Sequence, residues 1–175
     1  MFWLQMQMEA LGGFIDKGGP MLLALGVLVF ILWTLVFERI WYFQTGVKKD
    51  IKAAIDSWEA RSERTSWAAH QVREMLISRA RQRIEALLPM VATLVALAPL
   101  LGLLGTVTGM IEVFHVLAVT GGGDAKAMAG GVAKATLPTM SGMVIAISGL
   151  FAKTYLEQKA EVTSKMLEDH LTMDH

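Results

Sequence analysis

Three long stretches of this chain contain no Asp, Glu, Lys or Arg. They are residues 18–37, 86–111 and 135–152, which contain 20, 26 and 18 residues. The core of a bilayer is about 30 Å thick and is crossed by about 20 helical residues, within a range of about 17–25. Helices buried in a soluble bundle rarely lack charge for so long. The stretches therefore predict an all-α membrane protein with three transmembrane helices.

The lysines and arginines are distributed unevenly around these stretches. One lies before the first stretch and two lie between the second and third, which gives three on one side of the membrane. Ten lie between the first and second stretches and three lie after the third, which gives thirteen on the other side. Positively charged loops stay in the cytoplasm, so we expect the N-terminus outside and the C-terminus inside. Trp41, Tyr42 and Tyr155 follow the first and third stretches, where an aromatic belt at the cytoplasmic boundary is expected.

These signals divide the chain into seven segments. We expect an outer-surface amphipathic helix (1–17), a first transmembrane helix (18–43), a cytoplasmic helical segment (44–85), a second transmembrane helix (86–117), an outer loop (118–131), a third transmembrane helix (132–154) and a cytoplasmic helical tail (155–175). Gly18-Gly19-Pro20 marks the first boundary. Within the cytoplasmic segment we expect a turn at Arg61–Ser66, followed by a helix that continues into the second span.

Small residues are concentrated in the second and third spans. Gly, Ala, Ser and Thr account for 10 of 26 and 9 of 18 residues there, against 5 of 20 in the first stretch. Small residues let helix backbones approach each other, so we expect spans two and three to pack against protein and span one to face lipid. Their hydroxyls have two interpretations: bonding to carbonyls of the preceding helical turn, or lining a polar passage.

Several function classes are excluded or disfavoured. The chain has no cysteine, which excludes a disulfide or a thiolate metal site, and its four histidines lack ligand spacing. No nucleophile–base or metal constellation predicts an enzyme, a metal site or a cofactor. The 16 basic and 16 acidic residues balance, so no nucleic acid is expected as a partner. If the hydroxyls line a proton path, the charge-free stretches contain no Asp, Glu or His that could carry the proton across the membrane. Another polypeptide should then supply the titrating group.

One motif in the second span is long and specific. Ala98–Ile111 reads APLLGLLGTVTGMI and is followed by Phe114. This motif closely resembles the second-span signature of the ExbB/TolQ/MotA proton-channel family. Glu38-Arg39 resembles the acid–arginine pair that follows the family's first span, and Gly131–Ile147 matches span three more loosely. The short length and three spans resemble ExbB or TolQ more than the four-span MotA.

The resemblance implies a multi-pass subunit of the bacterial inner (cytoplasmic) membrane with the proton as coupling ion and no cofactor. It implies a homo-oligomer, a pentamer, around a dimer of an ExbD-type single-span partner. Proton flow would drive work on a TonB-type protein for outer-membrane import of nutrients such as iron-siderophore, haem or cobalamin. A TolQ-like subunit of the Tol-Pal envelope system is the alternative. A stand-alone ion channel and a membrane scaffold in contact with lipids are further alternatives.

The resemblance also assigns roles to single residues. Two pore threonines of the family correspond to Thr106 and Thr139. This chain departs from the family at Lys134, where many members have an acid, at Pro138, which removes a backbone donor, and at Glu112, where a neutral polar residue is expected. We expect these three at an outer mouth or a kink. The glycines expected at helix packing contacts are Gly102, Gly105, Gly109 and Gly142.

Overall fold

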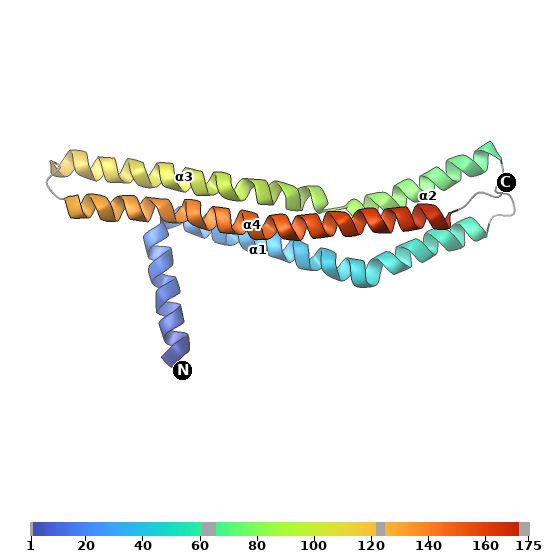
Figure 1. Ribbon diagram of the computed structural model, residues 1–175, viewed down its shortest axis with the longest axis horizontal. Helices are drawn as coiled ribbons and strands as arrows, with labels where there is room; N and C mark the ends of the chain where they lie inside the picture. The colour runs from blue at the N-terminus through green and yellow to red at the C-terminus, as the bar shows by residue number, and fades with distance from the viewer. Residues whose placement is uncertain (1, 61–65, 122–124, 172–175) are drawn as a thin grey trace. The chain divides into compact units, whose positions relative to one another are not determined.

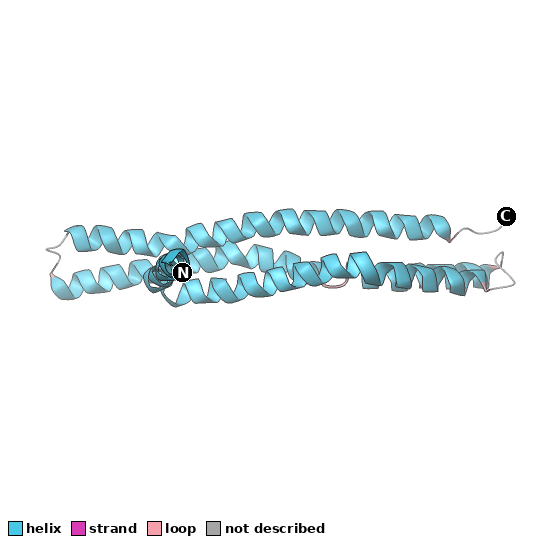
Figure 2. Cartoon of the chain, turned by 90° about the horizontal axis from the view of Figure 1, so that it is seen from below, coloured by secondary structure: helices cyan, strands magenta, loops and turns pink. Residues whose placement is uncertain are grey.

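The computed structural model describes residues 2–60, 66–121 and 125–171, which are helical almost throughout (Figure 2). The helices of this part are α1 (Phe2–Glu59), α2 (Trp67–Glu85), α3 (Leu88–Thr120) and α4 (Ala125–His170) (Figure 1). Three stretches are long and apolar enough to cross a membrane: Gly19–Glu59, Trp67–Val119 and Met128–His170. The predicted helical class and the three helices able to span a membrane are therefore confirmed.

Helix α1 is interrupted near its start. Gly19 has φ 66° and ψ −166°, outside the helical region, and Pro20 follows it. Glycine adopts a positive φ at little cost, and proline disfavours the helical conformation in the residue before it. The interruption lies within Gly18-Gly19-Pro20, the sequence that predicts a boundary before the first span.

Helix α2 does not continue into α3, so the expectation of one helix running into the second span is wrong. The helix ends at Glu85, and Ala86 has φ −52° and ψ 143°. Leu87 has φ 66°, and the next helix begins at Leu88. Pro89 contributes to the break between α2 and α3, because proline has no N–H to donate and its ring clashes with the carbonyl four residues earlier. That carbonyl belongs to Glu85.

The connection between α3 and α4 is shorter than the expected loop of residues 118–131. Helix α3 continues to Thr120, and α4 already begins at Ala125. The sequence AKAMA that starts α4 consists of strong helix formers, and these outweigh the two glycines that follow. Of the turn expected at Arg61–Ser66, residues 61–65 lie outside the described residues.

The chain forms two compact units, and the first contains Met1–Trp33 and Thr93–Leu150. Within it, the first helical stretch after Gly19 packs with α3 and α4. Large apolar side chains such as Phe30, Ile111 and Val144 remain exposed on these helices, which suits contact with lipid or with further chains. The buried apolar residues come from all three helices: Leu22, Leu25, Leu28, Leu32, Val95, Ala98 and Ala135.

The second unit contains Thr34–Ala92 and Phe151–His175, and its helices come from α1, α2, the start of α3 and α4. The Ser66 side chain caps α2 by accepting from the amide of Ala69 at 3.2 Å. A core cluster joins α1 and α2 with the end of α4 and consists of Ala54, Trp58, Ala69, Ala80, Leu167 and Leu171. Apolar residues of three helices therefore form the core of the second unit.

An arginine of α2 binds one carbonyl in the last turn of α4 and one in the residue that follows this helix. Arg73 Nε donates to the Leu171 carbonyl at 2.5 Å, and Arg73 Nη2 donates to the Glu168 carbonyl at 3.2 Å. The last carbonyls of a helix lack partners within that helix, and a positive charge is favourable at this end of the helix dipole. The contact therefore ties two helices of the second unit together.

Candidate functional site

Helices α3 and α4 of the first unit approach each other closely at glycines. A Cβ atom added to Gly142 would lie 2.5 Å from the carbonyl oxygen of Ala98. A Cβ atom added to Gly102 would lie 2.9 Å from the carbonyl oxygen of Pro138. Both neighbours are backbone atoms, so these positions leave no space for any side chain.

Gly105 and Gly109, the other two glycines expected at helix packing contacts, extend this contact along the same helices. A Cβ atom on Gly109 would lie 2.7 Å from the Cβ of Ala135, and one on Gly105 would overlap the ring of Pro138. Pro138 is fully buried, and α4 remains helical across it. Its ring therefore fills the space that the absent side chain of Gly105 leaves.

The two threonines singled out by the sequence meet across this contact. Thr139 Oγ1 donates to the Gly102 carbonyl of α3 at 2.8 Å, and it also forms a hydrogen bond with Thr106 Oγ1. Thr106 Oγ1 lies 3.4 Å from the same carbonyl. Both threonines are half-buried. The structure thus brings Thr106, Thr139 and Gly102 together in one hydrogen-bonded group.

Other hydroxyls of the spans have a different role. Each bonds to a carbonyl three or four residues earlier in its own helix, as is common in membrane helices. The sequence left two interpretations open for the hydroxyls. Thr106 also reaches a carbonyl four residues earlier in its own helix, and the threonine pair differs from the other hydroxyls by its hydrogen bonds between α3 and α4. Four other hydroxyls bond within their own helix: Thr108, Thr136, Ser141 and Ser148.

The two charged candidates from the sequence lie on the helices that carry the threonine pair. Glu112 of α3 and Lys134 of α4 are exposed. They line a cavity of about 530 Å³ in the first unit, together with Thr108 and with Gly19 and Pro20 at the interruption of α1. The cavity therefore brings a carboxylate and an ammonium group to the same opening.

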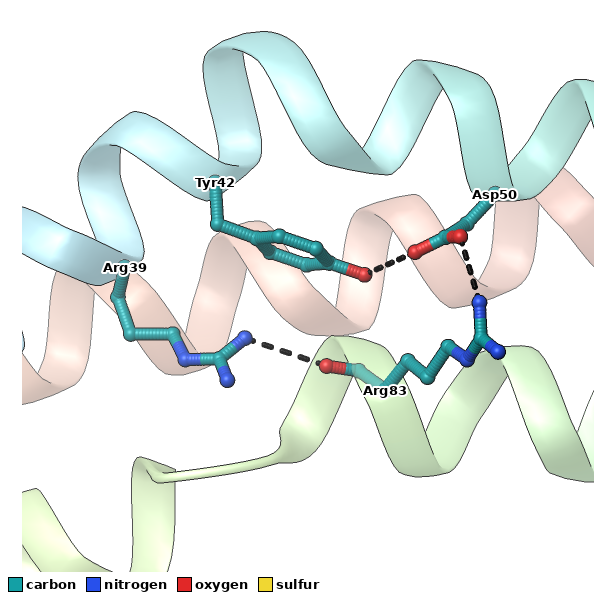
Figure 3. A network of polar contacts seen from close by, with 4 residues as sticks. All are labelled: Arg39, Tyr42, Asp50 and Arg83. Carbon is teal, nitrogen blue, oxygen red and sulfur yellow. Dashed lines mark hydrogen bonds and ion pairs between the residues drawn. The ribbon is translucent and has the colours of Figure 1, made fainter.

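A polar network in the second unit was only partly indicated by the sequence (Figure 3). Arg39 Nη1 donates to the Arg83 carbonyl at 3.2 Å, and its guanidinium carbon lies 4.8 Å from the centroid of the Tyr42 ring. The Tyr42 hydroxyl donates to Asp50 Oδ2 at 2.6 Å. Arg83 Nη1 pairs with Asp50 Oδ1 at 2.8 Å. The network connects α1 to the end of α2.

Arg39 is buried, with only 5% of the residue exposed. Its Nε lies 3.3 Å from Glu38 Oε2, yet this nitrogen forms no hydrogen bond with the described residues. The sequence analysis had already identified Glu38-Arg39 as a notable acid–arginine pair. The partners could not be found from sequence, because Arg83 lies 44 residues further along the chain.

A groove of the second unit carries charged side chains that the sequence analysis did not single out. It has a volume of about 510 Å³ and lies between α2 and α4. Lys165 Nζ lies 2.7 Å from Glu161 Oε1, and this hydrogen bond lowers the pKa of Glu161 and raises the pKa of Lys165. Among the described residues, no three His, Asp or Glu side chains lie close enough together to hold a metal ion.

Comparison with known proteins points to one family. The model of the MotA/TolQ/ExbB proton channel family matches residues 42–169. A putative biopolymer transport protein ExbB-like 1 from Synechocystis is 51% identical over 33% of this chain and 24% of its own length. The biopolymer transport protein ExbB of Helicobacter pylori is 41% identical over 39% of this chain and 47% of its own length. The Tol-Pal system protein TolQ of Pseudomonas aeruginosa is 34% identical over 49% of this chain and 37% of its own length. The chain thus spans less than half the length of these three relatives.

The glycine contact predicts a difference between two glycines of α4. Gly142→Ala should lower the stability of the protein by about 1–3 kcal/mol, because the new methyl group meets a backbone carbonyl that cannot rotate away. Gly130→Ala is the matched control, because a Cβ there meets nothing within 4 Å. The measurement is thermal unfolding in detergent, followed by circular dichroism. Equal unfolding temperatures of the two variants would contradict the close approach.

Proposed function

The chain belongs to the MotA/TolQ/ExbB proton channel family, and from this premise we propose that it is an inner-membrane subunit of an ExbB-type motor. With an ExbD-type partner it converts proton motive force into work on a TonB-type protein for nutrient import across the outer membrane. The observation that carries the proposal is the family match over residues 42–169. The relatives named ExbB and the three apolar helices support it.

Thr106 and Thr139 are the residues of this chain that we propose for the proton pathway. Each hydroxyl can donate and accept a hydrogen bond, and the pair already forms a group with the Gly102 carbonyl. Such a group can bond to a water molecule or to a carboxyl group that another chain presents. The charge-free stretches of α3 and α4 carry no acid of their own, so the proposal assigns the titrating carboxyl to the partner.

The proposed assembly is a ring of identical chains around the partner helices. Closed rings arise when one surface of a subunit binds a different surface of the next copy. The exposed apolar side chains of the first unit would be covered by neighbouring copies, partner helices and lipid. Five copies per ring follow from the family resemblance, and native mass spectrometry that finds a stable monomer would contradict the ring.

A TolQ-like role in the Tol-Pal system is the second candidate. The match to TolQ of Pseudomonas aeruginosa favours it, because this match covers 49% of the present chain. Complementation separates the two roles. An ExbB-type subunit should restore growth on siderophore-bound iron to a strain without ExbB. A TolQ-type subunit should instead restore detergent resistance to a strain without TolQ.

The threonine pair generates a prediction about proton flow. Thr106→Val and Thr139→Val keep the side-chain volume but remove the hydroxyl. A lost hydrogen bond to a charged group costs about 1.5–3 kcal/mol, so proton uptake should fall roughly tenfold or more. The measurement uses a pH-sensitive dye in proteoliposomes that contain the chain and an ExbD-type partner.

Thr136→Val is the matched control, because the Thr136 hydroxyl bonds within its own helix. We expect its proton uptake to stay close to that of the unchanged protein. Native mass spectrometry of all three variants checks that the complex still assembles. Normal uptake by both Thr106→Val and Thr139→Val in assembled complexes would reject the proposed pathway.

The charge distribution predicts the orientation, with the N-terminus and the connection between α3 and α4 outside. Because the chain has no native cysteine, single cysteines report accessibility without background. A membrane-impermeant maleimide should label Ala129→Cys in spheroplasts and Ser57→Cys only after permeabilisation. Both positions are exposed. Labelling of Ser57→Cys in intact spheroplasts would overturn the orientation.

A further inference from the structure

The four prolines of the chain have different effects on their helices. Pro99 lies inside α3 and Pro138 lies inside α4, and both helices continue across them. Pro20 follows an interruption, but there the positive φ falls on a glycine. Pro89 follows an interruption in which the positive φ falls on Leu87. Proline alone therefore does not explain why the chain breaks before Pro89.

The break has the backbone of a particular turn. Ala86 with φ −52° and ψ 143°, followed by Leu87 with φ 66°, has the backbone angles of the first central residue of a type II turn and the positive φ of the second. The second central position of this turn usually carries glycine, because a Cβ is disfavoured at positive φ. A leucine at this position needs stabilisation from elsewhere in the structure.

Arg39 supplies that stabilisation. In a continuous helix, the carbonyl of Arg83 would accept from the amide of Leu87. The turn takes Leu87 out of the helical region, and Arg39 Nη1 donates to the Arg83 carbonyl at 3.2 Å instead. The guanidinium charge is also favourable at the C-terminal end of α2.

The neighbours of Arg39 hold it in this position (Figure 3). Its guanidinium lies against the Tyr42 ring, and the Tyr42 hydroxyl is fixed by Asp50. Asp50 in turn pairs with the side chain of Arg83, the residue whose carbonyl Arg39 binds. All four residues belong to the second unit, so the network fixes α1 against the last turn of α2.

We propose that Arg39 is a latch that selects between two states of the segment from Arg83 to Pro89. In the latched state Arg39 binds the Arg83 carbonyl and the chain is broken at Leu87. Without the latch, the segment becomes a continuous helix that runs across its proline, as α3 and α4 do at Pro99 and Pro138, and Leu87 donates to the Arg83 carbonyl. The latch sets how the chain enters α3, and this inference does not rest on the proposed function.

The test is hydrogen–deuterium exchange of the backbone amides of Leu87 and Leu88 in Arg39→Gln. The continuous helix gives both amides helical acceptors, so their exchange should slow by about tenfold or more relative to the unchanged protein. A merely structural role for Arg39 predicts the opposite, because loosened packing accelerates exchange. Unchanged or faster exchange at Leu87 and Leu88 would overturn the proposal.

Four further variants complete the test. Arg39→Lys keeps a buried cationic donor and should keep the fast exchange of the unchanged protein. Arg39→Gln combined with Leu87→Gly should regain fast exchange, since glycine adopts positive φ at little cost. Arg79→Gln is the matched control, because Arg79 is an exposed arginine of α2, the helix that ends at the break. If Arg39→Gln does not fold, Arg39→Met removes the donor at similar volume and must show the same slowing.

Discussion

The close approach of α3 and α4 is the constraint on which the first unit depends. It exists because Gly102 and Gly142 place no side chain between the backbones, where a Cβ would meet a carbonyl within 2.9 Å and 2.5 Å. At this separation the Thr139 hydroxyl reaches the carbonyl of Gly102 in the other helix. Packing in a membrane gains little from the hydrophobic effect, so contact between backbones and hydrogen bonds across helices have greater weight.

The second unit depends on arginines placed at helix ends. Arg73 binds the carbonyls of Glu168 and Leu171 at the end of α4, and Arg39 binds a carbonyl of the last turn of α2. A buried carbonyl without a partner is costly, and a guanidinium can satisfy one while adding a favourable charge at the negative end of the helix dipole. Arginine thus satisfies carbonyls at the ends of two helices and connects each helix to a neighbour.

Much of the helical arrangement could be predicted because local sequence determines it. The charge-free stretches mark the apolar helices, and Gly19 before Pro20 marks an interruption that needs no distant partner. The break at Leu87 could not be predicted, because its stabilising donor, Arg39, lies far away in the sequence. The family resemblance indicated Thr106 and Thr139 as candidates. Their hydrogen bond depends on the packing of two helices, which the sequence does not specify.

In the proposed complex this chain forms one wall of a proton pathway and lacks the titrating group. Proton uptake by proteoliposomes that contain the chain alone tests this most directly, with the same vesicles plus an ExbD-type partner as comparison. The account predicts no uptake above that of empty vesicles for the chain alone, and uptake when the partner is present. Equal uptake with and without the partner would contradict it and would identify a self-contained channel. No uptake in either case would favour a scaffold.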